Sequence, residues 1–320
     1  MKQFLYRAKQ IISHAGAICP GSYNLRDYSS NKLLRVLVRL LVTPYYVIFR
    51  YFLGRKDIPG REGLALVLIA KNEATYIKEW LDFHIKQGVS NFIIYDNEST
   101  DNFREVLSPY IKAGIVIYNV IRGKSRQFDA YNMAMHKYRS KFKYMGFIDA
   151  DEFVFVRNNT YGGGGSTNLE AFMDDFMAAH PNAGGIGINW LIFGSSHHEK
   201  RPAGGVLENF TMCAERNFTA NHEIKTICDP ARALSMSIHN ATYIRGFYTL
   251  DENGRIIDGI YSEEVHFDKI RINHYFGRSR EEFIIKKNKG FASCIGSRDM
   301  SEFDLYDRNE VIDTEILSRI

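Results

Sequence analysis

From residue 64 onward, short apolar segments alternate with longer segments whose apolar residues recur at helical spacing. In the first of the longer segments, Ile77, Trp80, Leu81 and Ile85 fall on one helical face, and Gly88 closes the helix. The pattern predicts strands at 64–70, 91–96, 115–120 and 144–149. It predicts helices at 71–88, 102–113 (interrupted by Pro109) and 126–140.

Strands that alternate with helices in this way predict an α/β fold with a doubly wound, mostly parallel sheet. Ligands of such sheets bind where the strands end, at their carboxyl edge. Three polar clusters follow predicted strands directly, at 71–73, 96–101 and 149–152. The sequence therefore predicts one site, built from these clusters.

The last cluster places Asp149 and Asp151 two positions apart where a buried strand ends. Carboxylates so placed can face a common Mg²⁺ or Mn²⁺ ion that keeps positions open for phosphate oxygens. A solvated turn is the alternative, but the apolar strand before the pair and the aromatic strand 153–156 after it favour a metal site. An EF-hand is excluded because its ligand ladder and central glycine are missing.

Composition indicates a globular chain, since 45% of residues are apolar and only 7 are proline. The four cysteines form no Cys-x-x-Cys pair, which argues against a zinc ribbon or a disulfide scaffold and favours a reducing compartment. The net charge of +4 combines +9 in residues 1–61 with −5 in the remainder. The two parts are therefore expected to meet different partners.

Residues 33–53 are apolar enough to suggest a membrane span, but they contain Arg35, Arg39 and Arg50, each costing about 2.5–3.5 kcal/mol at a bilayer centre. The arginines share one face opposite aliphatic residues, which favours a helix lying on an anionic membrane surface, with Pro44 bending it. A helical hairpin packed on the protein is the alternative. A secretory signal is not expected, nor is nucleic-acid binding, because the charges alternate with large aliphatics.

The chain also resembles a known family. The segments KNEATYIKEWLDFH, GVSNFIIYDNESTDN, RQFDAYNMA and YMGFIDADEF are similar to glycosyltransferases of the GT-A fold, family 92. Two later blocks, NWLIFGSSHH (189–198) and INHYFGRSREEFIIKKNKG (272–290), resemble the same family, so the likeness covers about 64–292. His197 stands where the family has glycine, and Arg278 where it usually has lysine, so the acceptor side is expected to differ.

The resemblance implies a role for each cluster. Lys71, Asn72 and Glu73 would line the base and ribose of a nucleotide; Asp96, Asn97 and Asp101 would hold the uracil edge or ribose hydroxyls; Arg126 and Gln127 would face the diphosphate and donor sugar; Asp149 and Asp151 would bind the metal, with His274 or His239 as third ligand. The alternatives are helix caps for Glu73 and Asp101, a surface charge for Arg126 and a core histidine for His274.

Inverting glycosyl transfer needs a base that takes the proton of the acceptor hydroxyl, opposite the leaving group. The second half of the chain offers His198, Glu199, Glu208 and Glu215, and the sequence does not choose among them. His198 and Glu199 are the first candidates because His198 falls in a matching block.

The remaining segments complete the division of the chain. The glycine run at 161–168 lacks the P-loop pattern and is expected to be a flexible loop, with a moving lid as the alternative. We expect a membrane-associating extension at 1–61, the transferase domain at 62–297 and a helical tail at 298–320.

Together these features predict a metal-dependent, inverting glycosyltransferase. It would move a sugar from a UDP-sugar to a glycan or glycolipid hydroxyl at the cytoplasmic face of a membrane, in the synthesis of surface polysaccharide. The alternatives are a nucleotidyltransferase, although IAKNEA is not its Gly-rich basic loop, and a membrane-anchored nucleotide- or sugar-binding protein without transferase activity.

Overall fold

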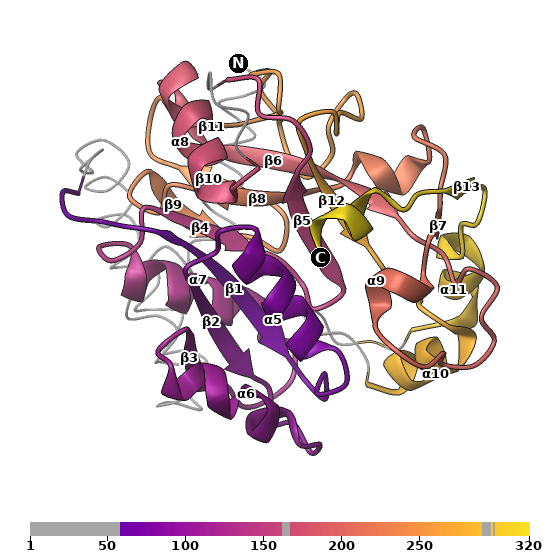
Figure 1. The fold of residues 1–320 in the computed structure, drawn as a ribbon. Helices are drawn as coiled ribbons and strands as arrows, with labels where there is room; N and C mark the ends of the chain where they lie inside the picture. Colours follow the sequence, from indigo (N-terminus) through magenta and orange to yellow (C-terminus); the bar gives the residue numbers. More distant parts are fainter. Residues whose placement is uncertain (1–57, 162–166, 290–295, 297) are drawn as a thin grey trace.

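The computed structural model describes residues 58–161, 167–289, 296 and 298–320. Within these ranges nine strands form one sheet, in the order β3-β2-β1-β4-β8-β6-β12-β5 with β11 beside β6 (Figure 1). The strands are β1 (Leu64–Ala70), β2 (Asn91–Asp96), β3 (Val116–Val120), β4 (Tyr144–Phe147), β5 (Glu152–Val156), β6 (Ala183–Ile192), β8 (Ile224–Cys228), β11 (Tyr248–Leu250) and β12 (Ile270–His274).

The first half of the sheet is parallel. Strands β3, β2, β1 and β4 run in one direction, and helices α5 (Ile77–Lys86), α6 (Phe103–Lys112) and α7 (Gln127–Tyr138) connect them. Four strands with three crossover helices reproduce the alternation predicted from the sequence. The predicted fold class, an α/β fold with a mostly parallel sheet, is confirmed.

The second half is mixed. Strand β8 pairs antiparallel with both β4 and β6, and β12 lies parallel to β6 but antiparallel to β5. Residues 148–151 link β4 directly to β5, although β8, β6 and β12 separate the two strands in the sheet order. Five peptide steps reach at most about 18 Å, and four strand spacings measure about 19 Å. The sheet therefore curls toward the segment that carries Asp149 and Asp151.

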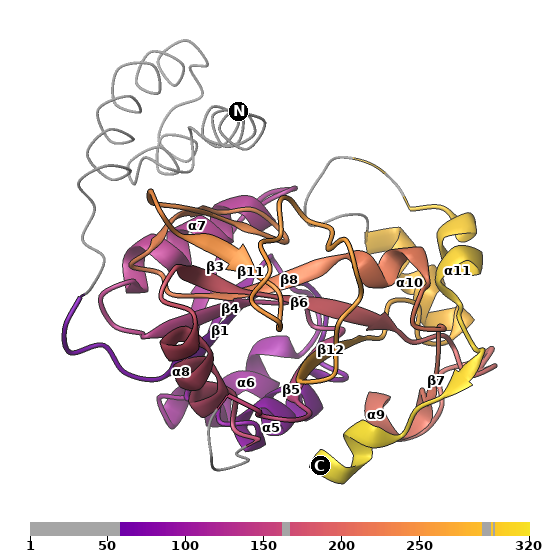
Figure 2. The ribbon, with the colours of Figure 1, turned by 90° about the horizontal axis from the view of Figure 1, so that it is seen from above.

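Helices cover both faces of the parallel half, as Figure 2 shows. Leu64, Leu66 and Leu68 of β1 pack in one core with residues of α5, α6 and α8 (Leu169–Ala179), whereas Ala65, Val67 and Ile69 pack in the other with residues of α7. Alternate residues of a strand face opposite sides. Both faces of β1 are therefore buried, which explains why its sequence is apolar without interruption.

Two helices differ from their predicted form. The predicted helix at 71–88 begins only at Ile77, because Asn72 has a left-handed backbone (φ 54°) that starts a turn. Helix α6 is not interrupted at Pro109 but continues through it and ends shortly afterwards at Lys112. Pro109 has no N–H to donate to the Glu105 carbonyl, and only three residues of the helix follow it.

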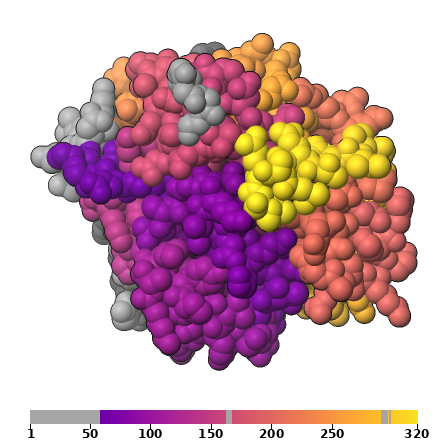
Figure 3. Space-filling view, in the orientation of Figure 1, coloured from indigo at the N-terminus to yellow at the C-terminus, as the bar shows by residue number. Residues whose placement is uncertain are grey.

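The C-terminal segment contains more than a helix. After α11 (Met300–Tyr306) come β13 (Val311–Ile312), which pairs with β7 (Met212–Cys213), and a 3₁₀ turn, η2 (Glu315–Arg319). In Figure 3 this yellow segment lies across the junction between the earlier and later parts of the described chain.

The smaller elements are β9 (Ala233–Met236) paired with β10 (Ala241–Tyr243), α9 (Val206–Asn209), η1 (Thr219–His222) and α10 (Arg280–Lys289). None of the helices in the described ranges has the length and apolar character needed to cross a bilayer. The extension predicted at 1–61 lies outside the described residues up to residue 57, as does the glycine run at 162–166.

Candidate active site

A cavity of about 960 Å³ opens at the carboxyl ends of β1 and β4, between the sheet and helices α10 and α11. Its lining includes Lys71, Asn72, Glu73, Asn97, Gln127, Asp149, Asp151, His239 and His274, all proposed from the sequence. Asp96, Asp101, Arg126, His198, Glu199, Glu208 and Glu215 are not in the lining.

Asp149 is held on both carboxylate oxygens by protein groups. Its Oδ2 accepts from Lys225 Nζ at 2.7 Å, and its Oδ1 accepts from Gln127 Nε2 at 2.7 Å and Tyr131 Oη at 3.1 Å. Burial alone would raise the pKa of Asp149, but the Lys225 ammonium lowers it below its usual value. Asp149 is thus a charged group held in place by Lys225, Gln127 and Tyr131, and its side chain keeps 32% exposure in the cavity.

Lys225 is fully buried and comes from β8, the strand beside β4. Its Nζ lies 3.6 Å from Glu152 Oε1, in addition to its bond to Asp149. Burial would lower the pKa of Lys225, yet these two carboxylates raise it above its usual value. Burial also raises the pKa of Glu152 above its usual value, although Lys225 acts in the opposite direction.

Asp151 has a different environment. Its Oδ2 accepts from Lys286 Nζ of α10 at 2.6 Å, while its Oδ1 lies 3.7 Å from His274 Nε2. Burial would raise the pKa of Asp151, but Lys286, followed by His274, holds it well below the usual range. His274 reaches this place because β12 pairs with β5 in a register that sets it opposite Glu152.

Asp151 and His274 suit a divalent ion as a pair of ligands. Asp151 Oδ1 and His274 Nε2 lie 3.7 Å apart and both residues line the cavity, so one ion can contact both after a small side-chain adjustment. No group of three or more His, Cys, Asp or Glu side chains in the described ranges is arranged to hold a metal. Water and phosphate oxygens would therefore complete the coordination, as is usual for Mg²⁺ with phosphate substrates.

The cluster after β1 also carries counter-charges. Glu73 Oε1 pairs with Lys289 Nζ at 2.9 Å, and Glu73 Oε2 lies 3.6 Å from Arg278 Nη1. Asn72 Oδ1 accepts from the Thr100 backbone N–H, which ties this turn to the one after β2. Lys71 is exposed at the cavity rim. Lys286, Lys289 and Arg278 thus bring three cations to one side of the cavity.

The sequence-predicted residues outside the lining have partners that fix the backbone. Asp96 accepts from the Ser99 N–H and the Tyr118 hydroxyl, and Asp101 Oδ2 accepts from the Ala74 N–H at 3.0 Å. Arg126 pairs with Asp129 at 2.8 Å and donates to the Arg122 carbonyl. These groups shape the turns around the cavity.

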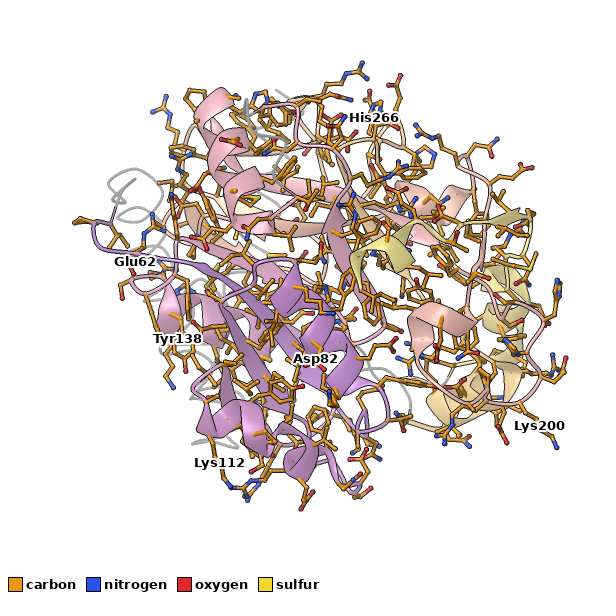
Figure 4. All side chains as sticks on the ribbon, viewed as in Figure 1. Glu62, Asp82, Lys112, Tyr138, Lys200 and His266 are labelled. Atoms are coloured by element: carbon orange, nitrogen blue, oxygen red, sulfur yellow. The ribbon has the colours of Figure 1, made fainter. Side chains whose placement is uncertain are left out.

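The base candidates chosen from the sequence lie elsewhere. His198 packs against Phe210, Glu199 is exposed, and Glu208 accepts from the Gly205 N–H at the start of α9. Lys200, which follows Glu199 in the chain, is labelled at the outer edge of the molecule in Figure 4. Glu215 also lies outside the lining.

Sequence reasoning missed Glu223, Lys225 and Lys286, which line or support the cavity. Lys286 could have been identified from the sequence, because it lies in the block 272–290 that carries the family resemblance. Lys225 offered one signal, a single cation inside the apolar strand IKTIC. Lysine is rarely fully buried unless it is paired with an acidic group, so a lysine in a buried strand indicates a carboxylate partner.

The family model of glycosyltransferase family 92 matches residues 67–298, and the chain belongs to that family. The membership of a glycosyltransferase family that the sequence predicted is thereby confirmed.

A family 92 protein of Oryza sativa subsp. japonica is 28% identical over 185 residues, which cover 56% of this chain and 29% of that protein. Galactan beta-1,4-galactosyltransferase GALS2 of Arabidopsis thaliana is 36% identical over 90 residues, covering 25% of this chain and 17% of GALS2. The chain thus spans less than a third of the length of these curated relatives. The crystal structure of S. aureus TarS 1–349 in complex with UDP aligns with a TM-score of 0.35 at 15% identity, covering 53% of this chain and 47% of TarS.

Proposed function

We propose that this protein transfers a sugar from a UDP-sugar to a hydroxyl of a glycan or glycolipid, with inversion at the anomeric carbon and with Mn²⁺ or Mg²⁺ as cofactor. The observation that carries the proposal is the Asp151–His274 pair, which faces a cavity of about 960 Å³ with Lys286 bonded to Asp151. The acceptor, the membrane surface and the cytoplasmic location are parts of the same proposal.

The cation, when bound, neutralises the negative charge that grows on the departing diphosphate. Asp151 and His274 would hold it, and Asp149 would stay on Lys225. The ammonium groups of Lys286 and Lys289 pair with carboxylates at this edge of the sheet. A bound diphosphate can replace those carboxylates as the hydrogen-bond acceptor. Asn72 and Asn97, from the turns after β1 and β2, would contact the nucleoside.

The test is calorimetric titration of UDP into the protein in EDTA and then in Mn²⁺, followed by UDP release from a panel of sugar nucleotides. We expect UDP to bind at least about tenfold more tightly with Mn²⁺, because like charges a few ångströms apart repel by several kcal/mol at an effective dielectric of about 20. Linkage requires UDP to tighten Mn²⁺ binding by the same factor.

Asp151→Asn should remove most of the Mn²⁺ effect, since it deletes one ligand charge. It also removes the charge that pairs with Lys286, so the melting temperature is measured to establish that the variant is folded. Asp268→Asn, at an exposed aspartate outside the cavity lining, is the matched control. Equal UDP affinities in EDTA and Mn²⁺ would contradict the metal assignment. UDP binding without turnover of any sugar nucleotide would instead support a binding protein that lacks transferase activity.

A further inference from the structure

Two carboxylate–imidazole pairs lie on either side of the Trp190 indole in the cavity. On one side Asp151 Oδ1 is 3.7 Å from His274 Nε2, and the His274 ring centre is 4.3 Å from that of Trp190. On the other side the His239 ring centre is 5.4 Å from Trp190, and His239 Nε2 is 3.7 Å from Glu223 Oε2. Strand β6, which carries Trp190, lies between β8 and β12 in the sheet. Glu223, bonded to the Trp190 backbone just before β8, and His274 on β12 therefore flank Trp190.

Glu223 differs from the other carboxylates of the lining because no hydrogen-bond donor in the described part of the chain contacts its side chain. Each of the others accepts a charged or neutral hydrogen bond at 3.3 Å or less: Glu73 from Lys289, Asp149 from Lys225, Asp151 from Lys286, Glu281 from the Arg201 N–H, Glu282 from Tyr76 and Ser279, and Glu302 from Arg298. Among the described residues, no group donates a hydrogen bond to the Glu223 carboxylate.

His239 does not neutralise Glu223. Its Nδ1 lies 3.1 Å from the Ile224 carbonyl, which can only accept, so Nδ1 carries the proton and Nε2 presents a lone pair toward Glu223. Burial lowers the pKa of His239 to about 3, so the ring is neutral at physiological pH. The Glu223 carboxylate and His239 Nε2 are thus both hydrogen-bond acceptors, and a hydroxyl of the substrate can donate to them.

The backbone fixes the position of Glu223 while its side chain keeps 15% exposure. The Glu223 carbonyl accepts from the Trp190 N–H at 3.1 Å, and the Glu223 N–H donates to the Ala220 carbonyl at 3.1 Å. The indole Nε1 of Trp190 is buried and has no hydrogen-bond partner among the described residues. Trp190 lines the cavity but is only 5% exposed, so it mainly separates the two pairs.

We propose that Glu223 is the general base of the transfer. The sequence alone had offered four other candidates for this role. Glu223 takes the proton of the acceptor O–H as the acceptor oxygen forms a bond to the anomeric carbon. The bond from that carbon to the diphosphate oxygen breaks, and its electron pair leaves with UDP on the side of Asp151 and His274. This inference rests on the proposed function, because it uses the donor and the inverting geometry stated there.

Two further observations agree with this role. Burial raises the pKa of Glu223, against the lowering effect of Lys225, and a higher pKa makes a carboxylate a better proton acceptor. The base candidates from the sequence, His198, Glu199, Glu208 and Glu215, do not line the cavity.

The test uses the full-length protein with Mn²⁺ and the sugar nucleotide that the wild type turns over fastest with water as acceptor. UDP release gives the rate, and calorimetry with UDP gives donor-site affinity. In Glu223→Gln we expect UDP release to fall by about 10²–10⁴-fold, with UDP affinity within about twofold of the wild type. Glu263→Gln, at an exposed glutamate outside the cavity, should keep both values.

Glu223→Asp is the second variant. It retains the negative charge beside Lys225, so we expect it to fold even if Glu223→Gln does not. It should bind UDP normally and release it at a rate between those of the wild type and Glu223→Gln. Near-normal UDP release in a folded Glu223→Gln, or loss of release in Glu199→Gln alone, would overturn the assignment while the proposed function stood. Parallel loss of UDP affinity and melting temperature in both Glu223 variants would show a structural role and overturn it too. A wild type that turns over no sugar nucleotide would overturn the proposed function, and this inference with it.

Discussion

His84 of α5 is completely buried, and both ring nitrogens contact the backbone. Its Nε2 accepts from the Val154 N–H at 3.1 Å, so Nδ1 carries the proton and donates to the Trp80 carbonyl at 2.8 Å. Trp80 and Phe153 pack on its ring. Burial lowers the pKa of His84 to about 3, against a usual value of 6.5. The folded protein therefore holds His84 neutral, whereas the unfolded chain takes up a proton below pH 6.5.

His84 should make stability depend on pH. Its contribution is fully present above pH 6.5 and is lost as pH falls toward 3, by about 1.4 kcal/mol per pH unit. Urea unfolding of the wild type and of His84→Asn at pH 7.5, 6.5 and 5.5 measures this. We expect the free energy of unfolding of His84→Asn to change less with pH by about that amount, and His197→Asn, at an exposed position, to retain the wild-type slope. Equal slopes in all three proteins would contradict the assignment of a neutral His84.

The sequence identifies some individual residues of the site and not others, for a physical reason. Asp149 and Asp151 follow a strand directly, so the local pattern alone brings them to the edge of the sheet. Lys225 and Glu223 reach the cavity through the pairing of β8 with β4 and β6, which joins residues far apart along the chain. Arg126 shows the opposite case, since its local position suggested a ligand role while a neighbour on its own helix, Asp129, pairs with it.

At the scale of elements, the C-terminal segment is attached to the sheet through a largely buried ion pair. Arg271 of β12, only 2% exposed, donates to Asp313 through Nη1 at 2.8 Å and Nη2 at 3.1 Å. The Ser195 N–H donates to Asp307 and the Ser196 N–H to Asn309, which fixes the other end of the segment. The segment therefore forms part of the folded structure.

Asp313→Asn should destabilise the protein by about 3 kcal/mol, because it leaves the buried Arg271 guanidinium without its bidentate partner. The matched control is Asp268→Asn, which breaks the exposed pair with Arg216, where the side chains are 50% and 63% exposed, and should cost less than about 1 kcal/mol. Urea unfolding at pH 7 with unchanged m-values measures both. Similar costs for the two variants would show that burial does not strengthen the Arg271 contact.

The parallel half of the fold was predictable from the sequence, and the mixed half was not. Strands β1 to β4 alternate with helices, so periodicity reveals each element in turn. Strands β6, β8 and β12 follow one another with irregular connections, and their order depends on the curl of the sheet around residues 148–151. Strand β13 has two exposed residues and pairs with β7, a contact that no local pattern indicates.

At the scale of the whole molecule, the charge asymmetry bears on where the protein acts. Residues 1–61 carry +9, and the proposed membrane contact places them on anionic lipid. Deletion of residues 1–58 should lower recovery with anionic liposomes at low salt, since each Lys or Arg near the surface contributes about 1 kcal/mol. Sedimentation with phosphatidylserine vesicles, and with neutral vesicles as the control, measures this. Equal recovery of the full-length and shortened proteins would favour the packed hairpin.

The burial of Lys225 between Asp149 and Glu152 also has a consequence for biosynthesis. The ribosome completes β4 and β5 before β8 exists, so a nascent chain holds the two carboxylates without the ammonium that pairs with them. They stay hydrated until β8 inserts between β4 and β6, and a shift of one residue in that insertion would turn Lys225 to the opposite face of the sheet. Burial of unpaired carboxylates would disfavour such a shifted sheet. Correct insertion of β8 therefore pairs Asp149 with Lys225, and the site is complete only after β12 and α10 bring His274 and Lys286 to Asp151.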